Sequence, residues 1–93
     1  MKTYKKKDYS NGTIKAFEFH PYDKDLDKNL KQIKSPCRVD NEKELVIDIL
    51  SATRLRLIAP PNVMVCIRDK QDGTQDYFTY SKHKFNELYT EVR

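Results

Sequence analysis

The chain has 93 residues and a formal net charge of +4, with 38% hydrophobic and 34% charged residues. This length holds one small domain with a single core, over residues 1–93, and the composition is that of a folded protein and not of a disordered one. No apolar run is long enough to span a membrane, and no apolar segment follows the lysine-rich start as in a signal peptide, so we expect a cytoplasmic protein.

The first residues predict a β-hairpin with strands on either side of Asn11-Gly12. This dipeptide accommodates the positive φ angles of a two-residue type I′ turn, and it places the first strand over residues 4–9. Pairing across the turn gives two cross-strand pairs of opposite charge, Asp8 with Lys15 and Lys5 with Glu18. The cluster of N-terminal lysines is therefore expected to lie on a strand and not on a loose arm.

A helix is predicted over residues 23–34, with Asp23 as its N-cap. Three apolar residues there recur at the spacing of one helical face, namely Leu26, Leu30 and Ile33. Ser35-Pro36 ends this helix, because the residue before a proline is disfavoured in helical conformation.

Apolar and polar residues then alternate, which predicts an antiparallel meander sheet. Its four strands are expected at about residues 44–50, 54–59, 63–69 and 75–80. Short loops keep one sheet face apolar if three pairs form, Asp48 with Arg56, Leu57 with Val65, and Ile67 with Phe78. The opposite, outer face then collects Val46, Asp48, Leu50, Arg54, Arg56, Ile58, Met64, Cys66, Arg68, Tyr77 and Thr79.

Ser81 is the expected N-cap of a C-terminal helix that covers the apolar face of this sheet. Its apolar stripe is Phe85, Leu88, Tyr89 and Val92. The predicted fold is therefore an α+β domain with the order ββαββββα.

The outer sheet face is the predicted contact surface for a protein partner. Arg54, Arg56 and Arg68 would be its charged anchors, and Met64 and Tyr77 its packing anchors, because arginine, tyrosine and methionine are enriched at interfaces. Alternatively, the N-terminal hairpin or the first helix covers this face. Such a face in a chain without catalytic motifs favours a small inhibitor or regulator, and residue usage typical of an AT-rich genome favours a bacterial or phage origin.

Nucleic-acid binding is the alternative function. The same arginines would then contact phosphates together with Lys5, Lys6 and Lys7. Most of the net charge, however, comes from the first nine residues, and this makes the basic isoelectric point weak support for it. A homodimer is a third expectation, because edge strands and a half-apolar face favour self-association.

Catalysis and cofactor binding are not expected. The chain lacks a glycine-rich phosphate loop, a GxSxG elbow and an HExxH motif. Cys66 and His83 stay open as a nucleophile and base, since such partners meet only in space. The histidines and cysteines lack the close spacing of structural metal sites, and Cys37 and Cys66 are expected to be reduced thiols.

Overall fold

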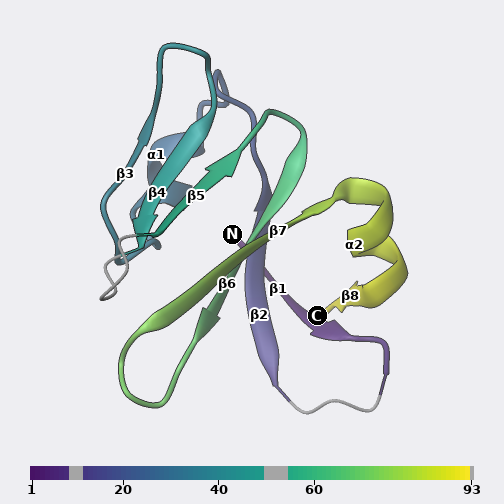
Figure 1. Cartoon of the computed structure of the whole chain (residues 1–93). Coiled ribbons are helices and arrows are strands. Elements are labelled where there is room, and N and C mark those ends of the chain that lie inside the picture. The colour runs from purple at the N-terminus through teal and green to yellow at the C-terminus, as the bar shows by residue number, and fades with distance from the viewer. Residues whose placement is uncertain (9–11, 50–54, 93) are drawn as a thin grey trace.

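The computed structural model describes residues 1–8, 12–49 and 55–92 (Figure 1). In chain order its elements are β1 (Lys2–Lys6), β2 (Thr13–Glu18), α1 (Leu26–Leu30), β3 (Cys37–Val39), β4 (Leu45–Ile49), β5 (Leu55–Ala59), β6 (Val63–Asp69), β7 (Gln75–Ser81), α2 (Lys82–Leu88) and β8 (Tyr89–Glu91). Within these residues, no helix is long and apolar enough to cross a membrane.

The strands form two antiparallel sheets and not one meander. The large sheet has the order β7-β6-β2-β1-β8, and the small sheet has the order β3-β4-β5. The small sheet and α1 lie on one side of the large sheet, and α2 lies on the other (Figure 1). The α+β class is confirmed, whereas the single four-stranded sheet is wrong because β5 and β6 belong to different sheets.

The chain leaves the small sheet at the two prolines that follow β5. Asn62 has a φ of 74°, and its N–H donates to the carbonyl of Phe19 at 2.8 Å. Phe19 in turn donates to the carbonyl of Val63 at 2.9 Å. These bonds pair β6 with β2, so Val65 lies opposite Phe17 instead of the predicted Leu57.

The strand registers agree with the prediction in one pair and differ in two. β4 and β5 pair as predicted, with Asp48 opposite Arg56; the predicted partners Leu50 and Arg54 lie outside the described residues. In β6–β7, Ile67 lies opposite Tyr77 and not Phe78, so the predicted register is wrong by one residue. Phe78 therefore shares a face with Cys66 and not with Ile67, although it lies beneath the C-terminal helix as predicted.

The N-terminal hairpin is present, but its register differs from the predicted one. Lys5 pairs with Thr13 and not with Glu18, and Asn11 of the predicted turn lies outside the described residues. The two predicted pairs of opposite charge are therefore wrong. Burial explains this register, because it places Tyr4 opposite Ile14 beneath α2.

Both faces of the large sheet are buried, each in its own core. The inter-sheet core is formed by Phe17, Phe19, Leu26, Ile33, Leu45, Ile47, Ala59, Val65 and Ile67. The helix-side core, beneath α2, is formed by Ile14, Ala16, Met64, Cys66, Phe85 and Tyr89. The alternation of side chains along β2 and β6 supplies one core with each face.

The two helices begin near the predicted residues but are shorter. α1 covers five residues, and the carboxylate of Asp23 accepts a bond from the N–H of Asp25 at 2.9 Å just before it. Ser81 caps α2 as predicted, since its hydroxyl accepts from the N–H of Lys84 at 3.2 Å. α2 ends at Leu88 because Tyr89 is extended and enters β8, which pairs with β1.

Candidate partner-binding surface

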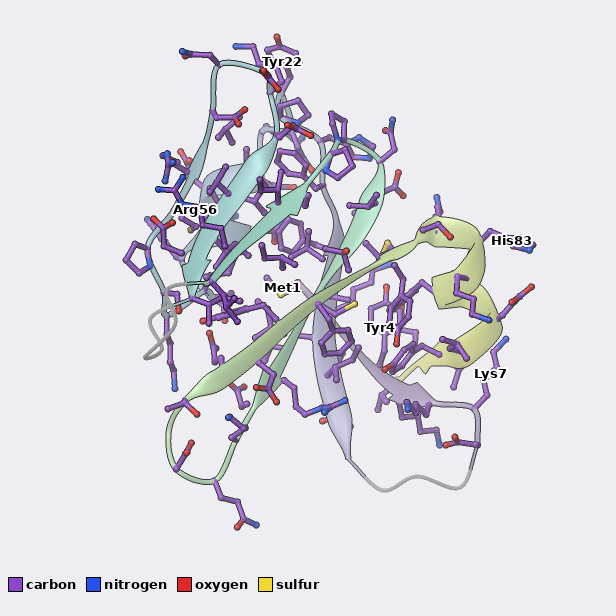
Figure 2. All side chains as sticks on the ribbon, viewed as in Figure 1. Met1, Tyr4, Lys7, Tyr22, Arg56 and His83 are labelled. Atoms are coloured by element: carbon purple, nitrogen blue, oxygen red, sulfur yellow. The ribbon has the colours of Figure 1, made fainter. Side chains whose placement is uncertain are left out.

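One face of the small sheet points away from the inter-sheet core. We call it the small-sheet outer face, and it consists of Arg38, Val46, Asp48, Arg56 and Ile58. These residues share a face because side chains alternate along each strand and the register places them side by side. Figure 2 shows Arg56 on the outside of this sheet.

Asp48 lies between the two arginines of this face. Its Oδ1 accepts a hydrogen bond from Arg56 Nε at 3.0 Å, and its Oδ2 accepts one from Arg38 Nη1 at 3.3 Å. The side chains of Arg38 and Arg56 are more than half exposed, whereas that of Asp48 is largely covered. Two guanidinium groups thus share one carboxylate, which leaves an excess of positive charge.

Apolar side chains are exposed beside this ion-pair group, on β5. Among the large apolar residues in the described part of the chain, Tyr22, Leu55 and Ile58 are more than half exposed, and two of these three belong to β5. We call Leu55, Arg56 and Ile58 the β5 patch; Arg56 and Ile58 lie on the small-sheet outer face, and Leu55 lies on the other face at the start of the strand. β5 is also an edge strand, because its partner within the described sheets is β4 alone.

The structure disperses the five residues predicted as partner anchors. Arg56 lies on the small-sheet outer face, whereas Met64 is buried in the helix-side core. Tyr77 packs against the inter-sheet core, where its hydroxyl donates to Gln75 Oε1 at 2.7 Å. Arg68 lies on the large sheet with its guanidinium 5.3 Å from the ring of Phe78, and Arg54 lies outside the described residues.

The N-terminal lysines also separate. Lys7 donates from Nζ to the carbonyl of Asn86 at 2.6 Å, next to α2. Lys6 lines a cleft together with Arg68, and Lys5 is exposed on the adjoining part of β1. The arginines of the small sheet and these lysines therefore do not form one continuous basic surface.

Sequence reasoning omitted Leu55 and Ile58 as contact residues. Ile58 belongs to the predicted outer face. Its position two residues after Arg56, on the same side of the strand, is a signal that could have identified it as a contact residue. The sequence predicts Leu55 on the apolar core face, and its pairing with Ile49 agrees; Leu55 is nevertheless exposed at the beginning of an edge strand. Nothing in the local pattern distinguishes an edge strand from a central one.

Cys66 and His83 do not meet. Cys66 is fully buried in the helix-side core, and burial raises the pKa of its thiol to about 12. The His83 side chain is 89% exposed on α2, where it contacts Glu87 at 3.0 Å, and Figure 2 shows it pointing to solvent. The arrangement provides no thiolate nucleophile beside a base.

A polar cluster surrounds Glu18 at the end of β2. Its carboxylate lies 2.9 Å from Lys82 Nζ and 2.8 Å from His20 Nε2. The hydrogen bond from Lys82 is the main cause that lowers the pKa of Glu18, against the opposing effect of burial. The described residues contain no group of three His, Cys, Asp or Glu side chains that could hold a metal ion.

No protein-family model matches the chain, and neither a curated protein nor a solved structure is significantly similar to it.

Proposed function

We propose that this chain is a small non-enzymatic binding protein that docks on a protein partner through the β5 patch. Its role would be that of an inhibitor or regulator of bacterial or phage origin. The exposure of Ile58 beside Arg56 on the small-sheet outer face is the observation that carries the proposal; Leu55 is exposed at the start of the same edge strand but on its other face. An exposed apolar group beside an arginine is typical of an interface centre.

The β5 patch favours a partner surface with a carboxylate between apolar groups. Arg56 Nε is already bonded to Asp48, but that carboxylate is also shared with Arg38. A second carboxylate would complete the coordination of the two guanidinium groups, and charge-assisted bonds of this kind are among the stronger polar contacts. Ile58, on the same face as Arg56, would supply apolar surroundings in which such a bond is effective.

The proposal can be tested by site-specific photo-crosslinking in cells of the native host. A photoreactive phenylalanine analogue is introduced in place of Ile58, and in a matched control it is introduced in place of Tyr22, the most exposed apolar side chain described. We expect a crosslinked partner protein from position 58 and none from position 22. Mass spectrometry of the crosslinked peptide should identify an acidic residue close to the crosslink.

A pair of charge-introducing substitutions provides a second test of the β5 patch. Ile58→Asp introduces a negative charge next to Asp48 and should weaken capture of the identified partner at least about tenfold, whereas Tyr22→Asp should not. Equal crosslinking from both positions, or no loss with Ile58→Asp, would contradict the proposal. Crosslinking of the chain to a second copy of itself would show a homodimer instead and would also overturn it.

A further inference from the structure

The large sheet divides at one end. β2 and β6 pair as far as Lys15 opposite Ile67, and their pairing stops there. Each strand continues with its hairpin partner, so Thr13 still pairs with Lys5 and Asp69 still pairs with Gln75. The hairpins β1–β2 and β6–β7 diverge beyond this point (Figure 1).

A cleft of about 610 Å³ opens where the two hairpins part. We call it the sheet fork; its polar lining is Thr3, Lys6, Thr13, Lys15, Arg68 and Asp69. Three strands contribute to it, since Lys6 comes from β1, Lys15 from β2 and Arg68 from β6. Its volume lies in the ordinary range of ligand-binding clefts.

The charges of the sheet fork are mainly positive and are not neutralised internally. Lys6, Lys15 and Arg68 form no ion pair with the described residues, although lysines elsewhere on the same sheet do, such as Lys2 with Glu91. The carboxylate of Asp69 is occupied by Gln75, whose Nε2 donates to it at 2.8 Å. Lys15 is also partly buried.

Tyr89 also lines the sheet fork and is only 5% exposed. Its hydroxyl is buried near Tyr80 and Cys66 of the helix-side core, and burial is the main cause that raises its pKa. Tyr89 therefore contributes a wall to the fork and leaves the polar contacts to the cations.

We propose that the sheet fork binds the phosphodiester backbone of a single-stranded nucleic acid. The lysine ammonium groups and the arginine guanidinium would pair with phosphate oxygens, and the threonine hydroxyls would donate to them. This surface is separate from the β5 patch, and neither proposal depends on the other.

The lining favours a strand backbone over a free nucleotide. Tyr89 is the aromatic residue among the described lining residues, and because it is buried it offers no face on which a base could stack. Lys5 is exposed on β1 next to the fork and would extend the row of cations along a strand. Contacts made to phosphates alone predict binding with little dependence on sequence.

The test is the salt dependence of binding to a labelled thymidine oligonucleotide of about 20 nucleotides, measured by fluorescence anisotropy. Three phosphate contacts predict that the logarithm of the association constant falls with the logarithm of salt concentration with a slope of about −2. The fork variant carries Lys6→Gln, Lys15→Gln and Arg68→Gln. The control variant carries Lys24→Gln, Lys28→Gln and Lys31→Gln, which are exposed positions in and around α1, and it has the same net charge.

We expect the fork variant to bind at least about tenfold more weakly at low salt and to lose most of the slope, while the control variant keeps the slope. Thermal unfolding of both variants establishes that they are folded. Lys15→Gln alone serves if the triple substitution unfolds the protein, and it should reduce the slope by about 0.7.

Three results would overturn this inference. The first is an equal loss of affinity in the fork and control variants, which would indicate a general effect of net charge. The second is the absence of wild-type binding at low salt. The third is displacement of the oligonucleotide by ATP or by a glutamate-rich peptide at a similar concentration of negative charge, which would show that the cleft does not select a nucleic-acid backbone.

Discussion

At the residue scale, the two cysteines occupy different environments although the sequence treats them alike. Cys66 belongs to β6 and is completely buried beneath α2. Cys37 is partly exposed on β3, an edge strand of the small sheet. Both thiols are unpaired, as the sequence predicts. Burial raises the pKa of both, and by far the more for Cys66, for which it reaches about 12.

This difference predicts selective alkylation. At about pH 8, iodoacetamide should modify Cys37 slowly and leave Cys66 unmodified in the folded protein, because the thiolate is the reactive form and must be accessible. Mass spectrometry of the two cysteine peptides before and after addition of denaturant gives the measurement. Rapid modification of Cys66 under native conditions would contradict its placement in the helix-side core.

At the element scale, the sequence predicts elements best where one face is exposed. The β4–β5 register is confirmed, because Arg56 and Asp48 alternate with apolar residues and only one alignment buries the latter. The β6–β7 register is wrong because the large sheet is buried on both faces. Tyr77 and Phe78 each fit an apolar environment, so alternation does not decide between them.

Two short strands escaped the sequence analysis for a related reason. β3 and β8 have three residues each, too few to show a period. Tyr89 also fits the apolar stripe of α2, and only its pairing with Lys6 reveals a strand. The same limit applies to predicting the contact surfaces from the sequence. Alternation assigns a side chain to a face of its strand but does not show which strand lies next to it.

The start of α2 gives a prediction at this scale. Ser81→Ala removes the hydroxyl that accepts from the N–H of Lys84 and should lower the free energy of unfolding by about 1 kcal/mol. Ser81→Asp keeps an acceptor at the same position and should restore most of that loss. Urea unfolding followed by circular dichroism compares the two variants, and a Ser81→Ala protein as stable as the wild type would argue against the cap.

At the scale of the whole molecule, the two cores share the strands β2 and β6. Ala16 and Cys66 face α2, whereas their neighbours Phe17 and Val65 face the small sheet. A change in either core therefore acts on the same two strands. We expect the small sheet and α2 to unfold in one cooperative transition and not as separate units.

A matched pair of substitutions tests this coupling. Ile14→Val in the helix-side core and Ile67→Val in the inter-sheet core each remove one buried methylene group. Each should lower the free energy of unfolding by about 0.5–1.5 kcal/mol. Tyrosine fluorescence and far-ultraviolet circular dichroism should report the same midpoint for each variant; two separate midpoints would show that the cores unfold independently.

The pairing of β8 with β1 determines how the fold responds to force. The two strands are antiparallel, with Tyr4 opposite Glu91 and Lys6 opposite Tyr89, so residue 2 and residue 92 lie at the same end of the pair. The ladder hydrogen bonds run perpendicular to the strands. Tension that separates residues 2 and 92 acts along the direction of these bonds and loads the bond nearest that end first. The bonds would then break one after another, as in opening a zipper, and β8 should peel from the sheet under a small load while the remaining strands stay folded.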